Sequence, residues 1–321
     1  MKIVVLDGHA ENPGDLSWQG LEALGDVTVY DRTDVHDEAL IRARIGDAEA
    51  VYTNKTPLTG ATIAAAPNLQ FIGVLATGYN VVDLEAARQR GIPVCNVPAY
   101  GTQEVAQYAM ALLLEICGSV GLHDRLVHEG KWSACPDFCF WETPILGLAG
   151  KTMGIVGFGR IGRALGRMAA AMGMKVLASG SRPCPEGEAI ADYVPLEELL
   201  AESDYVSANI PLTKQTEKFF GEKEFAQMKE GSYFINIARS PVADNDALKK
   251  YLLNGHLSGA ALDVFPHEPC TDSVFIDVPN VILTPHTASY TMENFVRMNE
   301  IAAQNVIDFA QGKLEGKYKV V

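Results

Sequence analysis

The run Gly157-Phe158-Gly159-Arg160-Ile161-Gly162 restricts the fold of this chain more than any other feature. It follows a short apolar run and precedes a helical stretch. Gly157 permits a tight turn, Gly159 lets the backbone approach a pyrophosphate, and Gly162 lets the helix pack closely on the strand. The free N–H groups at the start of that helix would face the phosphates. In this strand–turn–helix context the motif predicts a dinucleotide site of the Rossmann type.

Short apolar runs alternate with helical stretches along most of the remaining chain. Buried parallel strands are expected at Ile3–Leu6, Val27–Tyr30, Ala50–Thr53, Phe71–Leu75, Val94–Val97, Lys175–Ala178, Tyr205–Asn209, Tyr233–Asn236, Gly259–Asp263 and Val281–Leu283. This alternation predicts an α/β protein with doubly wound parallel sheets, and 321 residues suggest about two domains. A long apolar helix, Gln103–Cys117, lacks a polar face and is expected to be buried.

The charge balance and the cysteines exclude several function classes. The chain has 26 Lys+Arg against 40 Asp+Glu, a net charge of −14, which argues against nucleic acid as a partner. No apolar run reaches the ~20 residues of a membrane span, so no membrane is expected. The first residues turn acidic too soon for a signal peptide. The six scattered cysteines suggest reduced thiols and a cytoplasmic protein, and no spacing indicates a metal site.

The segment after the second strand of the dinucleotide fold predicts the kind of coenzyme. An acidic residue there normally binds the ribose 2′-hydroxyl of NAD. This chain has Ser179-Gly180-Ser181-Arg182 instead, with no carboxylate before Glu186. Ser181 and Arg182 could bind a 2′-phosphate directly. We therefore favour NADP(H), or use of both coenzymes. The alternative is NAD(H) with Arg182 as a solvated surface residue.

Two charged residues at expected strand ends are candidates for chemistry on a substrate. Arg239 lies in Asn236-Ile237-Ala238-Arg239-Ser240 and suits a planar carboxylate, although a salt bridge to an acid such as Asp244 is the alternative. His286 follows another strand and stands behind a proline. It is the best of the seven histidines as a general acid and base.

These motifs, in their order, resemble the D-isomer-specific 2-hydroxyacid dehydrogenases. The resemblance covers essentially the whole chain and is carried by the following segments: Ala76–Asp83, Gly157–Gly162, Ile210–Thr213, Asn236–Ser240, Asp263–Pro269 and Thr284–Ser289. Within the family the chain is most similar to glycerate dehydrogenases, which are hydroxypyruvate and glyoxylate reductases. The resemblance implies hydride transfer between NAD(H) or NADP(H) and a small D-2-hydroxy acid or 2-oxo acid, and no metal.

The resemblance also implies the domain plan. A Rossmann cofactor domain, residues 99–289, would be inserted in a flavodoxin-like substrate domain, residues 1–98 and 290–321. The active site would lie in a cleft between them. The family makes a homodimer the default. The aromatic stretch around Trp141 is similar to a loop that, in some glyoxylate reductases, reaches the partner subunit's active site; a plain core role for Trp141 is the alternative.

Site residues follow by mapping the family motifs onto this sequence. The catalytic residues would be Arg239, which binds the carboxylate, His286, which transfers the proton, and Glu268, which holds the other ring nitrogen of His286. Substrate-binding residues would be Lys55, Ala76, Thr77, Gly78 and Tyr79. Cofactor-binding residues would be Thr102, Gly157, Gly159, Arg160, Ile161, Gly162, Ser179, Ser181, Arg182, Asn209, Pro211, Ile237, Ala238, Asp263 and Ala288.

The sequence departs from the family pattern at a few positions. Asn209 stands where the family often has histidine, Asn80 follows Tyr79 where aspartate is common, and the acidic ribose contact is missing. These differences affect the choice of coenzyme more than the reaction. A rival function is a dinucleotide-sensing protein like the C-terminal-binding corepressors, which share this fold and the three catalytic residues. Turnover would distinguish the two, because a sensor binds NADH tightly yet reduces 2-oxo acids poorly.

Overall fold

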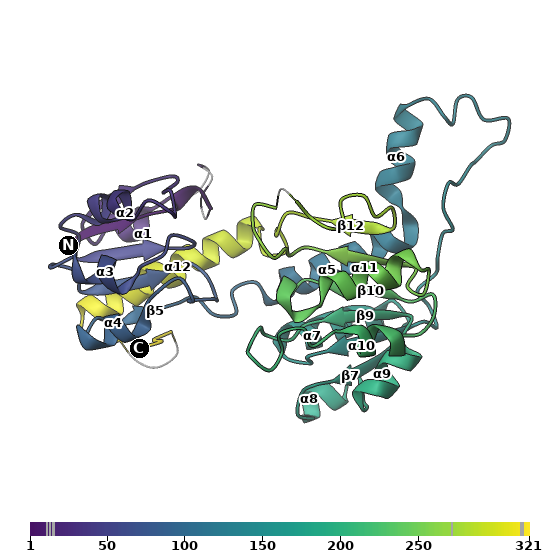
Figure 1. Cartoon of the computed structure of the whole chain (residues 1–321). Coiled ribbons are helices and arrows are strands. Elements are labelled where there is room, and N and C mark those ends of the chain that lie inside the picture. The colour runs from purple at the N-terminus through teal and green to yellow at the C-terminus, as the bar shows by residue number, and fades with distance from the viewer. Residues whose placement is uncertain (11, 13, 15–16, 271, 315–317) are drawn as a thin grey trace. The chain divides into compact units, whose positions relative to one another are not determined.

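The computed structural model describes residues 1–10, 12, 14, 17–270, 272–314 and 318–321. They cluster into two compact units (Figure 1). Unit 1 consists of Met1–Tyr100 and Tyr290–Val321, and unit 2 of Gly101–Ser289. The boundaries expected from the sequence lie within two residues of these divisions. Each unit is built around one parallel sheet.

Unit 1 contains a five-stranded sheet in the order β2-β1-β3-β4-β5. The strands are β1 (Lys2–Val5), β2 (Asp26–Val29), β3 (Ala50–Thr53), β4 (Phe71–Val74) and β5 (Val94–Cys95). The helices are η1 (Gly8–Ala10), α1 (Gln19–Glu22), α2 (Glu38–Ile45), α3 (Gly60–Ala64), α4 (Leu84–Gln89) and α12 (Met292–Ala310). This is the flavodoxin-like order, in which the direction of winding changes between β1 and β3.

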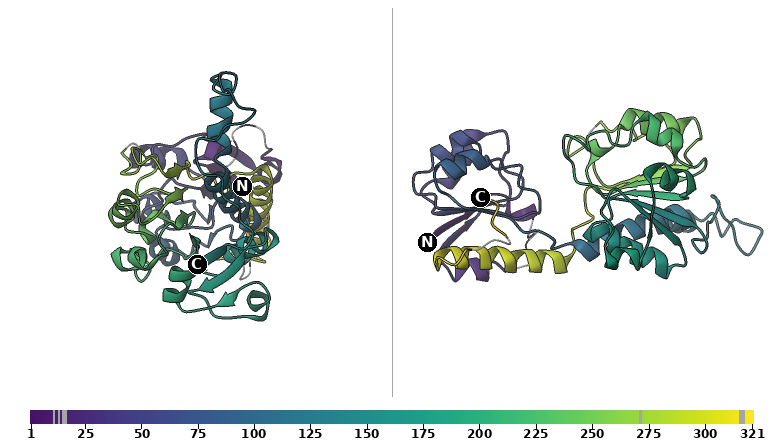
Figure 2. Two further views of the ribbon diagram at one scale, coloured as in Figure 1. Left: turned by 90° about the vertical axis from the view of Figure 1, so that its right-hand side faces the viewer. Right: turned by 90° about the horizontal axis from the view of Figure 1, so that it is seen from below.

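Both faces of the unit 1 sheet are covered by helices. Val4 and Leu6 pack into a cluster with residues of α2, α3 and α4. Ile3 and Val5 point to the opposite face and pack against α1 and α12. The right-hand view of Figure 2 shows α12 along one face of this sheet and the helices α2 to α4 on the other. Burial on both faces explains why β1, β3 and β4 consist mostly of apolar residues, whereas β2 at the edge has no buried residue.

Unit 2 contains a seven-stranded sheet in the order β12-β11-β10-β9-β6-β7-β8. The strands are β6 (Thr152–Val156), β7 (Lys175–Ser179), β8 (Asp192–Tyr193), β9 (Tyr205–Ala208), β10 (Tyr233–Asn236), β11 (Gly259–Leu262) and β12 (Val281–Leu283). The helices are α5 (Thr102–Gly118), α6 (Val120–His128), α7 (Arg160–Ala171), α8 (Pro185–Glu188), α9 (Leu196–Glu202), α10 (Glu222–Gln227), η2 (Ser240–Val242) and α11 (Asn245–Leu253). The order is the Rossmann order, extended by β12, and the winding direction changes between β6 and β9.

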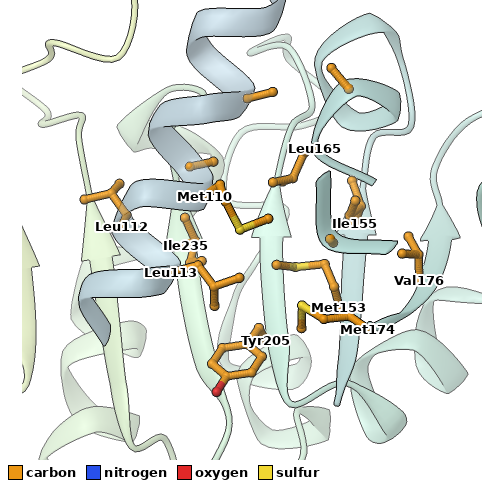
Figure 3. Packing of buried hydrophobic residues seen from close by; sticks show 14 of the residues in the cluster. Met110, Leu112, Leu113, Met153, Ile155, Leu165, Met174, Val176, Tyr205 and Ile235 are labelled. Atoms are coloured by element: carbon orange, nitrogen blue, oxygen red, sulfur yellow. The ribbon is translucent and has the colours of Figure 1, made fainter. Parts of the chain in front are cut away.

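The two faces of the unit 2 sheet have separate cores. Ile155 packs with Leu165 and Met110 in a cluster that α5 and α7 cover (Figure 3). Its neighbour Val156 belongs to the opposite cluster, with residues of α9, α10 and α11. The close-up shows Met110 and Leu113 of α5 directed at β6 and β10, where Met153 and Ile235 meet them (Figure 3).

Helix α5 is buried on one side only, so the expectation of full burial is wrong. Ala106, Ala109 and Leu113 are buried. Residues spaced three or four apart on the other side are exposed, among them Ala111 and Leu114. Although this helix is mostly apolar, one of its sides is therefore exposed in the single chain.

Helix α6 and the segment that follows it, residues 129–146, extend away from the sheet of unit 2 (Figure 1); we call residues 120–146 the arm. None of the residues of α6 is buried. Phe138 is 90% exposed, Trp141 67% and Ile145 66%. Among the described residues no single helix is both long and apolar enough to cross a membrane, and α5 with α6 meets that criterion only as a pair bent by 58°.

Candidate active site

All strands of the unit 2 sheet are parallel, so they end at one edge. The segments that follow these strand ends carry most of the predicted site residues of unit 2. They are Gly157 after β6, Ser179 to Arg182 at β7, Asn209 after β9, Arg239 after β10, Asp263 after β11 and His286 after β12. In doubly wound sheets this edge is where ligands bind.

The glycine turn between β6 and α7 has the geometry that the sequence predicts. Gly157 has φ +93°, and a Cβ there would lie 2.7 Å from the carbonyl carbon of Asn209. A Cβ at Gly162 would lie 2.4 Å from the carbonyl oxygen of Gly157. At Gly159 the space is open, because no atom surrounds the position of a Cβ within 4 Å. Gly159 therefore leaves room at the N-terminus of α7 for a phosphate group, as a nicotinamide dinucleotide requires.

The segment after β7 carries an unpaired cation. Arg182 is exposed and takes part in no ion pair or hydrogen bond within the described part of the chain. Glu186 lies close by in sequence but is engaged, with its oxygens 3.4 Å from Nε of Arg163 and 3.2 Å from Nη1 of Arg167. Ser181 is half-buried. The carboxylate that could bind a ribose 2′-hydroxyl is thus already neutralised by two arginines.

Asn209 follows β9, next to the glycine turn. Its Nδ2 donates to the backbone oxygen of Ser207 at 3.2 Å and to the hydroxyl of Ser207 at 3.0 Å. Its Oδ1 is buried and has no hydrogen-bond partner among the described residues. A buried acceptor without a donor in the protein is consistent with a site in which a ligand supplies the donor.

The other residues predicted to bind the coenzyme differ in exposure. Ile237 and Ala288 are buried, Thr102, Ile161 and Ala238 are half-buried, and Arg160 and Pro211 are exposed.

His286 and Glu268 form a direct pair. Nδ1 of His286 lies 2.6 Å from Oε2 of Glu268, and both side chains are about one-third exposed or less, at 28% and 33%. The other carboxylate oxygen of Glu268 accepts from the backbone N–H of Phe265 at 3.0 Å. This arrangement fixes the ring and leaves Nε2 as the nitrogen that can exchange a proton with a substrate.

The loop that carries His286 is held by Asp263. The Asp263 side chain is fully buried; Oδ1 accepts from the hydroxyl of Thr284 at 2.8 Å and from N–H of Thr287 at 2.9 Å. Oδ2 accepts from N–H of Ala288 at 2.9 Å. His286, between these anchors, has φ +55°, which L-residues adopt only when surrounding contacts impose it. Asp263 thus shapes the His286 loop, and its predicted contact with the coenzyme stays a prediction.

Arg239 is exposed at the end of the β10 loop. The side chain of Asn236 holds this loop, since Oδ1 accepts from N–H of Ala238 at 3.0 Å and Nδ2 donates to the Arg239 carbonyl at 3.1 Å. Nη1 of Arg239 donates to the carbonyl of Ala238 at 2.7 Å. Asp244, the alternative partner, pairs with Lys218 at 2.9 Å instead. The guanidinium therefore keeps most of its donors for a ligand.

In unit 1 the predicted substrate residues lie at the carboxyl ends of β3 and β4. Lys55 is exposed after β3. After β4, the carbonyls of Ala76, Thr77 and Tyr79 accept from Val97, Asn96 and Val82. The N–H groups of residues 76–79 donate no hydrogen bond within the described part of the chain. Four consecutive free N–H groups in one loop provide donors suited to an anion.

Comparison with known proteins identifies the family. Residues 110–288 match the family model described as D-isomer specific 2-hydroxyacid dehydrogenase, NAD binding domain. The chain belongs to this family.

Similarity to individual proteins extends over nearly the whole chain. The dehydrogenase is 48% identical over 315 residues to a hydroxypyruvate reductase of Blautia hydrogenotrophica, covering 97% of this chain and 98% of the relative. A D-lactate dehydrogenase from Aquifex aeolicus, solved with NAD and lactic acid, is 27% identical with a TM-score of 0.83, covering 100% of this chain and 99% of the other. An acyclic imino acid reductase solved with NADPH and D-Arg is 25% identical with a TM-score of 0.84 and full coverage of both chains.

The chain is therefore a nicotinamide-dependent D-2-hydroxyacid dehydrogenase. The relatives are reductases and dehydrogenases, and they give no support to the sensor alternative. Sequence reasoning did not single out Asn236, or the role of Asp263 in holding the His286 loop. Both are polar residues at the ends of otherwise apolar strands. That position could have indicated that their side chains hold the loops that follow.

Proposed function

We propose that this dehydrogenase reduces hydroxypyruvate to D-glycerate, with glyoxylate as a smaller alternative substrate. The observation that carries the chemistry is the 2.6 Å bond between His286 and Glu268 at the carboxyl edge of the sheet. The identity of the substrate is supported by the 48% identity to a hydroxypyruvate reductase over almost the whole chain.

His286 serves as the proton donor in reduction and as the base in the reverse direction. Glu268 binds Nδ1, so the ring is oriented with Nε2 available to the keto oxygen. The carboxylate also stabilises the positive charge of the doubly protonated ring before the proton is given up. The reduced nicotinamide, when bound, supplies the hydride. Asp263 anchors the His286 loop on both sides of the histidine.

Arg239 binds the carboxylate of the 2-oxo acid and polarises its carbonyl group. A guanidinium offers two parallel donors that match a carboxylate, and Arg239 is not used in an ion pair in the described structure. In unit 1, the free N–H groups of residues 76–79 offer donors suited to an anion. Lys55 is exposed after β3, the strand that pairs with β4 in unit 1.

The coenzyme is NADPH in preference to NADH. Arg182 is exposed and unpaired, and Ser181 stands beside it, so both can bind a 2′-phosphate. Glu186, the carboxylate that would repel that phosphate, is paired with Arg163 and Arg167. Gly159 would leave room for the pyrophosphate at the start of α7, in the close turn that Gly157 and Gly162 permit.

The deciding experiment is an absorbance assay of NADPH and NADH oxidation with hydroxypyruvate, glyoxylate and pyruvate. We expect the highest kcat/KM for hydroxypyruvate with NADPH. Arg182→Ala should raise KM for NADPH at least tenfold and leave KM for NADH within twofold; equal effects on both would refute the 2′-phosphate contact. Tight coenzyme binding without turnover of any 2-oxo acid would refute the proposed substrate and favour a sensor.

We further propose that the arm pairs two copies of the chain into a homodimer. Phe138, Trp141 and Ile145 are exposed in a segment that has a defined internal structure, because Nε1 of Trp132 donates to the Phe138 carbonyl at 3.1 Å. An apolar surface of this kind is typical of an interface between subunits. Sedimentation should give the mass of a dimer for the natural chain and that of a folded monomer for Phe138→Asp. The same mass for the natural chain and the variant would contradict the proposal.

A further inference from the structure

Helix α5 contacts the His286 loop through a hydrogen bond between two side chains. The hydroxyl of Tyr108 lies 2.9 Å from Oγ1 of Thr287, the residue that directly follows His286. Both side chains are half-buried, and all three residues belong to unit 2. Tyr108 and Thr287 are 179 residues apart in the chain. The bond therefore joins the loop to an element outside the strand ends that carry the other site residues.

Helix α5 is well anchored on the sheet and supports this contact. Ala109 and Leu113, on its buried side, have no exposed surface, and Leu113 is directed at the sheet (Figure 3). Near the end of the helix, Sγ of Cys117 lies 3.3 Å from the hydroxyl of Tyr205 on β9. Because close packing and this second contact hold the helix in place, Tyr108 presents its hydroxyl from a fixed position.

The His286 loop needs support from more than one side. His286 has φ +55°, and a residue in this conformation keeps it only where surrounding contacts impose it. The contacts that Asp263 makes with the loop all meet at one carboxylate, so they still allow the loop to tilt about that group. Tyr108 binds the hydroxyl of Thr287 from the helix, which restricts this tilt.

We propose that Tyr108 is a positioning residue that, through Thr287, keeps the ring of His286 in the orientation that transfers the proton. The inference rests on the proposed role of His286 and refines it. Without the bond, the loop adopts orientations in which Nε2 of His286 does not reach the keto oxygen, so proton transfer slows. Arg239, which binds the substrate carboxylate, follows a different strand. The loss therefore falls on the rate of the reaction and not on KM.

The test compares Tyr108→Phe, Thr287→Val and the double variant in the full-length enzyme. The readout is the rate constant of NADPH oxidation in a single turnover at saturating hydroxypyruvate, with KM measured alongside. Each single change should lower this rate constant about fivefold, the scale of one hydrogen bond, and leave KM within about twofold. The double variant should be within about twofold of either single variant, because both changes remove the same bond. Thr287→Ser keeps the hydroxyl and should recover most of the loss.

Tyr205→Phe is the matched control, because it also removes a hydroxyl that contacts α5, but at Cys117 and away from the His286 loop. It should leave the rate constant unchanged. An unchanged rate constant in Tyr108→Phe, or multiplied losses in the double variant, would overturn the inference. Equal losses in Thr287→Ser and Thr287→Val would also overturn it.

Amide hydrogen exchange tests the same inference without turnover. The peptide that spans residues 284–289 should exchange faster in Tyr108→Phe than in the natural enzyme or in Tyr205→Phe, because Thr287 has lost one of its anchors. Equal exchange in the three proteins would overturn the inference. Failure of the natural enzyme to reduce hydroxypyruvate would instead refute the proposed function, and the exchange result would then decide the inference.

Discussion

Alanine at two glycines of the β6–α7 turn should separate folding from coenzyme binding. At Gly162 the new methyl group would lie 2.4 Å from the carbonyl oxygen of Gly157 and 3.1 Å from Cγ2 of Ile155. The first contact is with backbone, so α7 must move away from β6. Overpacking of this kind costs about 3 kcal/mol, and the better helix propensity of alanine offsets about 1 kcal/mol. We expect Gly162→Ala to lose about 2 kcal/mol of unfolding free energy and to bind coenzyme poorly.

Gly159→Ala should weaken coenzyme binding and leave the unfolding free energy almost unchanged. Its φ is −77°, which alanine adopts freely, and nothing surrounds the methyl position within 4 Å. Alanine is a poorer helix cap than glycine, which destabilises the fold, but it also lowers the entropy of the unfolded chain, which stabilises the fold. The two effects nearly cancel, so the unfolding free energy should stay within about 0.5 kcal/mol of that of the natural enzyme. The methyl group would occupy the space that a pyrophosphate needs. Losing two hydrogen bonds to charged oxygens at about 1.5 kcal/mol each corresponds to a Kd for NADPH raised roughly 100-fold.

Both quantities can be measured on the same preparations, by urea unfolding followed by circular dichroism and by calorimetric titration with NADPH. Gly147→Ala is the control, because Gly147 also has open space around its Cβ position but lies outside the turn. It should change neither quantity. If Gly159→Ala bound NADPH like the natural enzyme, the coenzyme would not approach the turn, and the reasoning would be refuted. Equal instability of the two turn variants would refute the steric argument.

Three further changes test the site and the fold. His286→Asn should abolish reduction while the Kd for NADPH stays within threefold; loss of both together would argue against a role in proton transfer. Asp263→Asn should lower kcat at least tenfold and destabilise the enzyme by about 2 kcal/mol, because the amide cannot accept on both sides; unchanged kcat would refute its role in holding His286. Burial acts to raise the pKa of Asp204, but the hydrogen bond from Lys229 and its other partners lower that pKa below its ordinary value. Its contribution to stability is therefore present at neutral pH and lost as the pH falls through the lowered pKa, so Asp204→Asn should destabilise at pH 7 more than near pH 3.

Strands were the most predictable part of the fold. Ala50–Thr53, Tyr233–Asn236 and Val281–Leu283 have the bounds expected from the sequence. Ala50–Thr53 is buried throughout, and a strand buried on both faces appears as a run of mostly apolar residues. Helix α6 was not predicted, and no residue of α6 is buried. Strand β8 has two residues, too few for any pattern.

Site residues at strand ends could be predicted because parallel strands bring their carboxyl ends to one edge. What could not be predicted is which polar residues hold the loops. Asp7 binds a loop that begins 47 residues later, and Asn96 binds Thr77 19 residues earlier. Such pairs depend on the register between neighbouring strands, which a single sequence does not specify when every strand is equally apolar. The strand order, known only from the structure, makes these partners neighbours.

Two acidic residues illustrate why the position of a residue in a motif does not by itself determine its role. Glu268 and Asp263 both belong to the segment that resembles the family pattern, and both were assigned to the site from the sequence. Glu268 is one-third exposed and directs one oxygen at His286, so it can act on the reacting histidine. Asp263 is fully buried and uses both oxygens on the loop around His286. Because His286 has a positive φ, the enzyme needs the second carboxylate to impose the backbone before the first can orient the ring.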